Sequence, residues 1–185
     1  MALPNQICGA AFSHLWERVA EGRVRAERSE GKTFRLKLPF MKAVLQRVSS
    51  ASVEVGDEIV SQIEVGFCVF VTVSSDDTEE NARKMAGKIA GMRVFSDAEG
   101  KFNLDLKDVG GSVLLVSNFT LFGDARKGNR PYFGAAARPE LAQELFELLA
   151  TLLRSHGLEV RTGVFGADMK VSLRNEGPVT LTLEF

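Results

Sequence analysis

From residue 41 onward, the chain consists mostly of short apolar segments separated by turn residues, and this pattern limits the fold more than any other feature. Segments rich in Val, Leu, Ile and Phe and bounded by Gly, Asp, Asn or Pro are typical of β-strands. Gly56-Asp57, for example, supplies turn chemistry between two of them. We predict strands at residues 42–49, 52–55, 59–63, 65–73, 92–95, 102–106, 112–119, 158–162, 169–174 and 179–184.

Two other segments have helical periodicity. Asp76 or Asp77 can cap a helix that runs to about Ala90, and the apolar residues of this segment fall on one face. A second helix begins at Pro139, which suits the first helical position, and Gly157 suits the position just past its end. Many short strands with two helices predict an α+β domain with a mainly antiparallel sheet or an open barrel.

Residues 1–40 differ from the rest of the chain. They carry interspersed Arg, Lys and Glu, show neither strand alternation nor a clear helical stripe, and lack the apolar stretch of a secretory signal peptide. We predict a poorly ordered extension at residues 1–40 and one domain at residues 41–185. Met41 is a natural start for that domain.

The composition argues against several classes of protein. The formal net charge is −1, so any RNA contact must come from a local basic patch. No uninterrupted apolar run approaches the roughly 20 residues that span a bilayer, and we expect no membrane partner. The chain has two cysteines, Cys8 and Cys68, and two histidines, His14 and His156, so residues 41–185 hold one of each. This scarcity argues against a disulfide, a Cys–His catalytic pair or a zinc site. We predict a reduced, cytoplasmic setting.

The long loop at residues 121–138 is rich in Gly, Arg and Asn. Loops of this length in compact domains are usually functional or disordered. Arg126, Lys127, Arg130 and Arg138 are opposed nearby only by Asp124, so they suit contacts with phosphate groups. The same cluster also fits an ordinary solvated loop, which the spacing alone favours.

Two short motifs carry groups that could meet a ligand. Ser117-Asn118-Phe119-Thr120 ends an apolar strand, so its hydroxyls and amide could hydrogen-bond a ligand and its ring could stack on a base. Gly177-Pro178 lies between two predicted strands and marks a turn. Taken alone, each motif also fits a structural role: a core phenylalanine with satisfied strand-end hydroxyls, and a simple turn.

Four segments carry a resemblance to a known family. The first is Met41-Lys42-Ala43-Val44-Leu45-Gln46-Arg47-Val48, and the second is Arg93-Val94-Phe95-Ser96-Asp97-Ala98-Glu99-Gly100-Lys101-Phe102-Asn103. The others are Ser117-Asn118-Phe119-Thr120-Leu121 and Asn175-Glu176-Gly177-Pro178-Val179-Thr180. In this order they resemble the D-aminoacyl-tRNA deacylase family over about residues 41–185. The departure is Asn118, where the family has Gln.

The resemblance implies a homodimer that hydrolyses the ester joining a D-amino acid to tRNA, with tRNA mischarged with glycine as a further candidate substrate. Gly177-Pro178, joined by a cis bond, would reach into the partner's pocket, face the substrate amino group and exclude L-amino acids. Arg47 would hold this element in place. The resemblance also implies Asn118 and Phe119 as contacts of the terminal adenosine, Phe165 and Met169 as lining of that end of the site, and Ala137 as a backbone N–H donor near the ester.

The chemistry does not depend on an evident catalytic side chain. Thr120 is a candidate nucleophile in this family and Ser117 lies close to it, but a hydroxyl nucleophile needs a base, and none is near in sequence. We expect water or the vicinal 2′-hydroxyl of the terminal ribose to react. The protein would supply positioning and backbone N–H groups for the oxyanion, with no metal and no cofactor.

Three alternatives stay open at this point. A non-catalytic RNA-binding module would use the same basic loop and Phe119. A related deacylase would have a trans Gly-Pro bond and tolerate L-amino acids. A serine hydrolase would use Ser112 or Ser117, although no histidine partner is evident.

Overall fold

The computed structural model describes residues 40–185. The extension predicted at residues 1–40 lies outside this range except for Phe40, and so do Cys8 and His14. None of the helices within residues 40–185 is long and apolar enough to cross a membrane.

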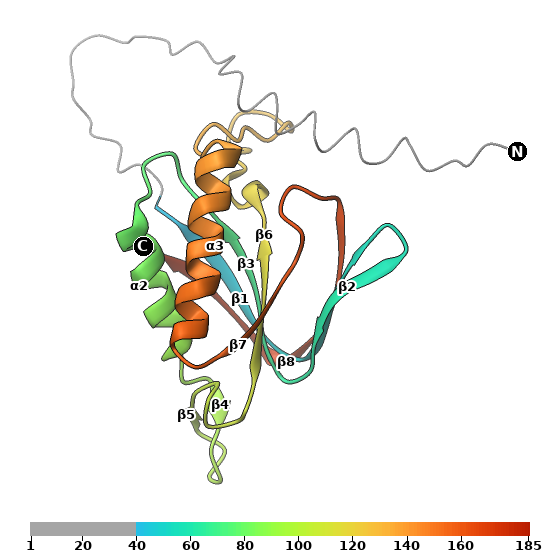
Figure 1. Ribbon diagram of the computed structural model, residues 1–185, viewed down its shortest axis with the longest axis vertical. Coiled ribbons are helices and arrows are strands. Elements are labelled where there is room, and N and C mark those ends of the chain that lie inside the picture. The colour runs from blue at the N-terminus through green and yellow to red at the C-terminus, as the bar shows by residue number, and fades with distance from the viewer. Residues whose placement is uncertain (1–39) are drawn as a thin grey trace, which may run out of the picture.

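The two longest strands of the sheet pair with each other (Figure 1). Strand β1 (Lys42–Val55) pairs with β8 (Met169–Glu184) in antiparallel register along almost its whole length. We predicted each as two short strands, which is wrong. The other edge of β1 changes neighbour midway, because its first half pairs with β3 and its second half with β2. The polar residues in its middle therefore mark an exchange of partner and not a turn.

The sheet is mixed, with the order β2-β1-β3-β6-β7 and β8 on the other edge of β1. The neighbours of β1 are antiparallel to it, whereas β3, β6 and β7 run parallel. Parallel neighbours need a long crossover, and helices α2 and α3 provide the two crossovers. The predicted α+β class with two helices is confirmed, with more parallel pairing than expected. The shorter strands of this sheet are β2 (Glu58–Ile63), β3 (Gly66–Thr72), β6 (Ser112–Ser117) and β7 (Glu159–Thr162).

Helix α2 (Glu79–Ala90) is capped by Thr78, not by either of the two preceding aspartates as predicted. Asp77 is buried instead. Its carboxylate accepts hydrogen bonds from the backbone N–H of Ser74 at 2.6 Å and of Met41 at 2.9 Å. Asp77 therefore joins the start of β1 to the connection between β3 and α2.

The two helices lie side by side on one face of the sheet (Figure 1). Helix α3 (Pro139–Ser155) begins at Pro139, as predicted. Successive strand residues point to opposite faces, so Phe67 and Val69 enter the larger core beneath the helices. Cys68 enters a second core on the other face, which β1, β2, β6 and β8 enclose. Burial raises the pKa of Cys68 to about 12, so this thiol stays protonated.

A small hairpin projects from the end of the molecule that is lowest in Figure 1. It consists of β4 (Phe95–Ser96) and β5 (Phe102–Leu104), both shorter than predicted. Asp97 and Gly100 form its turn, in which the Gly100 N–H donates to the Asp97 carbonyl at 3.0 Å.

Candidate active site

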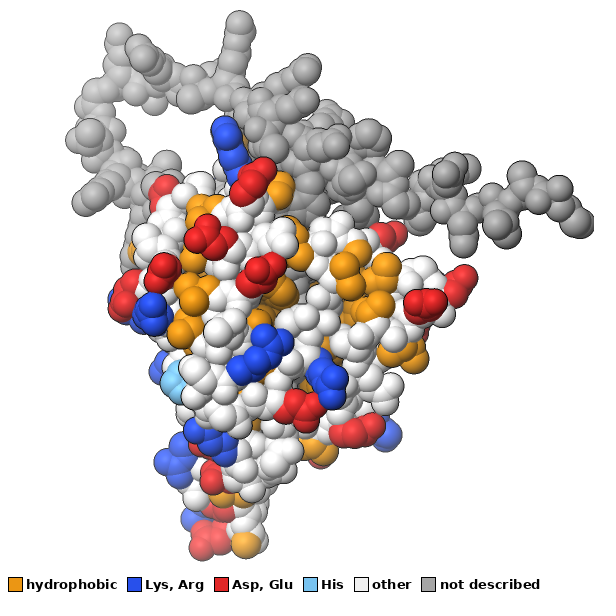
Figure 2. All heavy atoms as spheres, in the orientation of Figure 1, with side chains coloured by type: hydrophobic (Ala, Val, Ile, Leu, Met, Phe, Trp, Pro, Cys, Tyr) orange, Lys and Arg blue, Asp and Glu red, His pale blue; other side chains and the backbone are white. Residues whose placement is uncertain are grey.

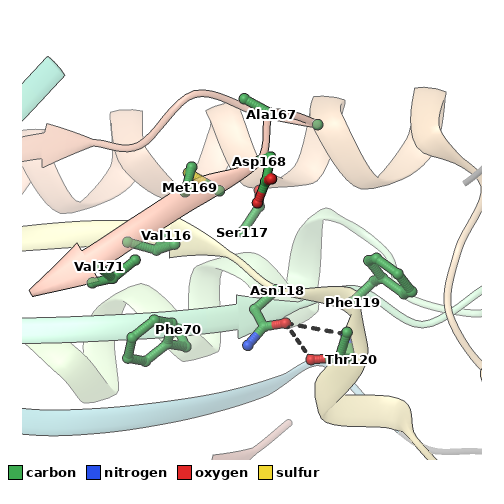
Figure 3. A pocket seen from close by; sticks show the side chains of 11 residues that line it. Phe70, Val116, Ser117, Asn118, Phe119, Thr120, Ala167, Asp168, Met169 and Val171 are labelled. Atoms are coloured by element: carbon green, nitrogen blue, oxygen red, sulfur yellow. Dashed lines mark hydrogen bonds between the residues drawn. The ribbon is translucent and has the colours of Figure 1, made fainter. Parts of the chain in front are cut away.

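A pocket of about 250 Å³ opens where β6 ends, above the second core. One wall is the sequence Ser117-Asn118-Phe119-Thr120, which leads from β6 into the short 3₁₀ helix η1 (Phe119–Phe122). The facing wall comes from the loop before β8 and from the first residues of β8, including Met169 (Figure 3). The structure therefore brings five of the predicted site residues together from two distant parts of the chain.

Asn118 and Thr120 are joined by two hydrogen bonds across the pocket wall (Figure 3). The Thr120 hydroxyl donates to Asn118 Oδ1 at 2.6 Å, and the Thr120 backbone N–H donates to the same oxygen at 3.2 Å. The amide oxygen is thus occupied, and the Asn118 amide nitrogen is directed away from it, toward the side of Phe70. An amide oxygen is a poor base, so this arrangement orients the Thr120 hydroxyl without activating it.

Ser117 also lines the pocket, but Ser112 lies at the other end of β6. At about 3.3 Å per strand residue, the two serines are roughly 16 Å apart. The Ser112 hydroxyl donates to Glu159 at 3.2 Å. His156 follows α3 close to that far end, and no histidine lines the pocket among the described residues. The serine hydrolase alternative therefore finds no catalytic pair here.

Phe119 belongs to a small core of its own. Its side chain is buried and contacts the ring of Phe133 edge to face, with the ring centroids 5.3 Å apart. Phe119 lines the pocket, but only 5% of its surface is exposed, so little of the ring is available to a ligand. Phe165 does not line this pocket, but it borders a smaller adjoining cavity together with Asn118 and Phe119. The predicted contacts of the adenosine end are thus neighbours, in two adjoining spaces.

Met169 and Asp168 complete the facing wall. A Cβ at Gly163 would lie 2.7 Å from the Met169 sulfur, so glycine leaves the space in which the thioether lies. Sequence reasoning missed Asp168, which is the one ionisable residue lining the pocket among residues 40–185. The signal in the sequence was that Asp168 directly precedes Met169, which begins a predicted strand and was itself a predicted site residue.

Ala137 lies apart from the pocket, and its N–H already has a partner. Its backbone N–H donates to the carbonyl of Val73 at 2.8 Å and is therefore used within the fold. Ala137 lines neither the pocket nor the adjoining cavity. An N–H donor to the ester at this residue stays a prediction, which the hydrogen bond to Val73 makes less favourable.

Gly177-Pro178 forms a bulge in β8. Gln46 pairs with Thr180 and Val48 with Asn175, so residues 176–179 bulge outward opposite Arg47. The Gly177–Pro178 bond is cis, as the resemblance implied, and the trans alternative is wrong for this structure. Asn175 closes the bulge, because its Oδ1 accepts from the Val179 N–H at 2.9 Å and its Nδ2 donates to the Val179 carbonyl at 3.1 Å.

Arg47 braces this bulge from β1. Its Nε donates to the Glu176 carbonyl at 3.0 Å, and its Nη1 donates to the Val94 carbonyl. The predicted supporting role of Arg47 agrees with these contacts. Neither Arg47 nor Gly177-Pro178 lines the pocket of the same chain. Arg47 pairs with Phe67 at the start of β3, whereas the pocket lies at the other end of that strand.

The basic loop is exposed. Arg126 pairs with Asp124 at 2.6 Å, and this bond lowers the pKa of Asp124 to about 2. Lys127 and Arg130 are also exposed. On the face shown in Figure 2, acidic and basic side chains are interspersed. The described residues contain no group of three His, Cys, Asp or Glu that could hold a metal ion.

Comparisons with known proteins identify similar chains. The model of the D-Tyr-tRNA(Tyr) deacylase family matches residues 44–184. A D-aminoacyl-tRNA deacylase of Thermus aquaticus is 54% identical over 144 residues, which cover 78% of this chain and 95% of that protein. One of Brevibacillus brevis is 53% identical over 144 residues, with coverage of 78% and 99%.

Two solved structures are similar in fold. One is described as a c-Myc DNA unwinding element binding protein, with a TM-score of 0.73, 40% identity, and coverage of 78% of this chain and 98% of that chain. The other is described as a probable eukaryotic D-amino acid tRNA deacylase, with a TM-score of 0.68, 19% identity, and coverage of 78% and 99%. At that identity the second similarity shows the fold alone.

Proposed function

The chain belongs to the D-Tyr-tRNA(Tyr) deacylase family, and on this basis we propose that it hydrolyses the ester of D-aminoacyl-tRNA, releasing the D-amino acid and the tRNA. One observation carries the assignment to a site. The pocket at the end of β6 gathers the strand-end motif and Met169, which are residues that the family resemblance implies at the substrate. We propose a cytoplasmic setting, where the tRNA substrate is found.

Asn118 is the proposed contact of the terminal adenosine. Its oxygen already accepts two hydrogen bonds from Thr120, so its amide group can offer N–H donors to acceptor atoms of the base. Met169 and Phe119 supply apolar contact in the same pocket. These groups can hold the end of the tRNA in a fixed position without taking part in bond breaking.

The proposed reacting group is water or the 2′-hydroxyl next to the ester. In hydrolysis, a water oxygen bonds to the ester carbon, the ribose 3′-oxygen leaves with a proton, and the carboxylic acid is released. Attack by the 2′-hydroxyl would first move the acyl group to the 2′-oxygen, with the proton passing to the 3′-oxygen, and water would then release the acid from that ester. A threonine nucleophile would first have to transfer its proton to a base. Thr120 donates that proton to an amide oxygen, and this supports a positioning role for the hydroxyl.

Chiral selection is proposed to involve two subunits. The bulge at Gly177-Pro178 lies away from the pocket of its own chain, at the other end of β3, so it can meet a substrate only in another copy. This separation supports the homodimer that the family resemblance implies. The backbone carbonyls of the bulge would then face the substrate amino group from the partner.

The decisive experiment measures release of amino acid from D- and L-tyrosyl-tRNA by the purified protein. We expect hydrolysis of the D ester and protection of the L ester. One solved relative is described as a DNA-binding protein, which makes binding without hydrolysis the competing function. Retention of D-tyrosyl-tRNA on the protein with no release of tyrosine would establish that alternative. Equal hydrolysis of both esters would exclude chiral selection.

A further inference from the structure

Phe102 combines exposure with a specific contact. It lies on β5 of the projecting hairpin, and 58% of its surface is exposed. Its ring centroid nevertheless lies 5.3 Å from Cζ of Arg47, within the range of a cation–π contact. Phe95 of β4 lies 5.9 Å from the same atom. The hairpin thus presents two aromatic rings to one guanidinium group.

Arg47 needs these contacts because it is almost completely buried. Only 8% of its surface is exposed, and no ion pair joins it to another residue of the described range 40–185. A buried cation without a carboxylate is costly unless carbonyl groups or ring faces replace the water it has lost. The carbonyls of Glu176 and Val94 supply part of this replacement, and the two rings supply the rest.

The two rings differ in how firmly they are held. Phe95 is buried and stacks on Phe67 in the main core, with centroids 5.2 Å apart. Phe102 keeps 58% of its surface exposed in the single chain, and its ring covers one side of the guanidinium. Removing its ring would let water reach Arg47 and compete for the hydrogen bond to Glu176, which is the first residue of the bulge.

We propose that Phe102 is a positioning residue for chiral selection, acting through Arg47 on the Gly177-Pro178 bulge. The proposal rests on the proposed deacylase function. The ring excludes water from the Arg47 guanidinium and keeps it directed at the Glu176 carbonyl. Arg47 in turn fixes the direction of the bulge. An exposed aromatic residue on a surface hairpin is therefore part of the machinery that distinguishes D- from L-amino acids.

The first test measures the ratio of kcat/KM for D-tyrosyl-tRNA to that for L-tyrosyl-tRNA. In Phe102→Ala, and in Phe102→Leu, which keeps apolar bulk but loses the ring face, the ratio should fall about tenfold, the size of a well-shielded cation–π contact. Phe102→Tyr keeps the aromatic ring and should keep the wild-type ratio. Ile59→Ala is the matched control, because Ile59 is 60% exposed on β2 and does not contact Arg47.

A double-mutant cycle tests the route through Arg47. In an Arg47→Ala background, Phe102→Ala should have no further effect on the ratio, because the contact is already lost. A tenfold effect that persists in this background would overturn the proposal, since Phe102 would then act directly. A ratio that stays within about twofold of the wild-type value in both Phe102→Ala and Phe102→Leu would overturn it as well.

A spectroscopic measurement separates this proposal from the proposed function. The ¹⁵N-edited signal of the Arg47 Nε–H should be shifted by the ring and exchange slowly with water in the wild-type protein. It should move and exchange faster in Phe102→Ala, but not in Phe102→Tyr. An unshifted signal with unchanged exchange in Phe102→Ala would refute the contact. If the signal shows the contact but the wild-type protein hydrolyses no D-tyrosyl-tRNA, the proposed deacylase function is wrong, while the contact between Phe102 and Arg47 stands.

Discussion

Replacing Gly177 with alanine should lower both stability and activity, because the bulge leaves no space for a side chain. The residue has φ of +128°, a backbone conformation that L residues rarely adopt. A Cβ there would lie 2.8 Å from a methyl group of Val179 and 2.9 Å from Nη2 of Arg47. The first contact is with a branched side chain next to the bulge, and the second is with the group that braces it.

The expected cost has two parts. A strained backbone conformation of this kind costs about 1–3 kcal/mol. Forcing a methyl group into packed surroundings costs about 1–3 kcal/mol more. The free energy of unfolding should therefore fall by roughly 2–6 kcal/mol, against the about 5–15 kcal/mol typical of a native domain. We expect the variant to stay folded while the bulge and Arg47 move.

Urea unfolding and hydrolysis of D-tyrosyl-tRNA measure the two effects. Gly56→Ala is the matched control, because Gly56 also has positive φ, at +64°, but a Cβ there would meet no atom within 4 Å. That control should lose only about 1–2 kcal/mol from the backbone and keep its activity. Gly177→Ala should in addition lose at least about tenfold in kcat/KM. A Gly177→Ala protein as stable as Gly56→Ala and as active as the wild type would refute the reasoning.

Three further predictions concern the pocket and the start of β1. Thr120→Ala should lose less than about tenfold in kcat if Thr120 only positions the substrate. Loss of a nucleophile would lower kcat roughly thousandfold or more, so a loss of that size with unchanged tRNA binding would contradict the positioning role. Asn118→Gln should keep or improve activity, whereas Asn118→Ala should lose about fivefold, the value of one hydrogen bond; equal losses in the two variants would mean that the pocket requires the shorter side chain. Burial raises the pKa of Asp77 from 3.8 to about 6 despite the hydrogen bonds from Ser74 and Met41, so the native chain binds this proton more tightly than the unfolded chain. We compare the free energy of unfolding of the wild type with that of Asp77→Asn at each pH. The difference should favour the wild type most below pH 3.8 and fall by about 2–3 kcal/mol as the pH rises to 6. Urea titrations in which this difference stays flat or rises with pH would contradict the prediction.

Local patterns in the sequence were sufficient for the class of fold and for the start of one helix. Helical periodicity and the fixed φ of proline depend on neighbours in the chain, so the helix at Pro139 could be predicted to the residue. The strand-end motif at Ser117–Thr120 is also contiguous, and its residues share a pocket because they are consecutive at the end of a buried strand.

Tertiary structure decided everything that depends on distant partners. The centre of β1 is polar because its neighbour changes there, and a local pattern cannot distinguish this change from a turn. Asp77 resembles a helix cap in sequence, but its carboxylate accepts a hydrogen bond from the Met41 N–H and so joins two elements of the fold. Thr78 caps the helix instead. The Ala137 N–H donates to the Val73 carbonyl in the connection between β3 and α2, and the spacing of residues in the sequence does not predict this contact.

The same division holds for the site. The family resemblance implied roles for Gly177-Pro178 and Arg47, but only the pairing of β8 with β1 brings the bulge against the guanidinium. The contact of Phe102 with Arg47 depends on the position of the hairpin beside that pair. Hydrogen bonds and cation–π contacts act over a few ångströms in space, and residues that are far apart in the chain meet at that range only once the sheet has formed.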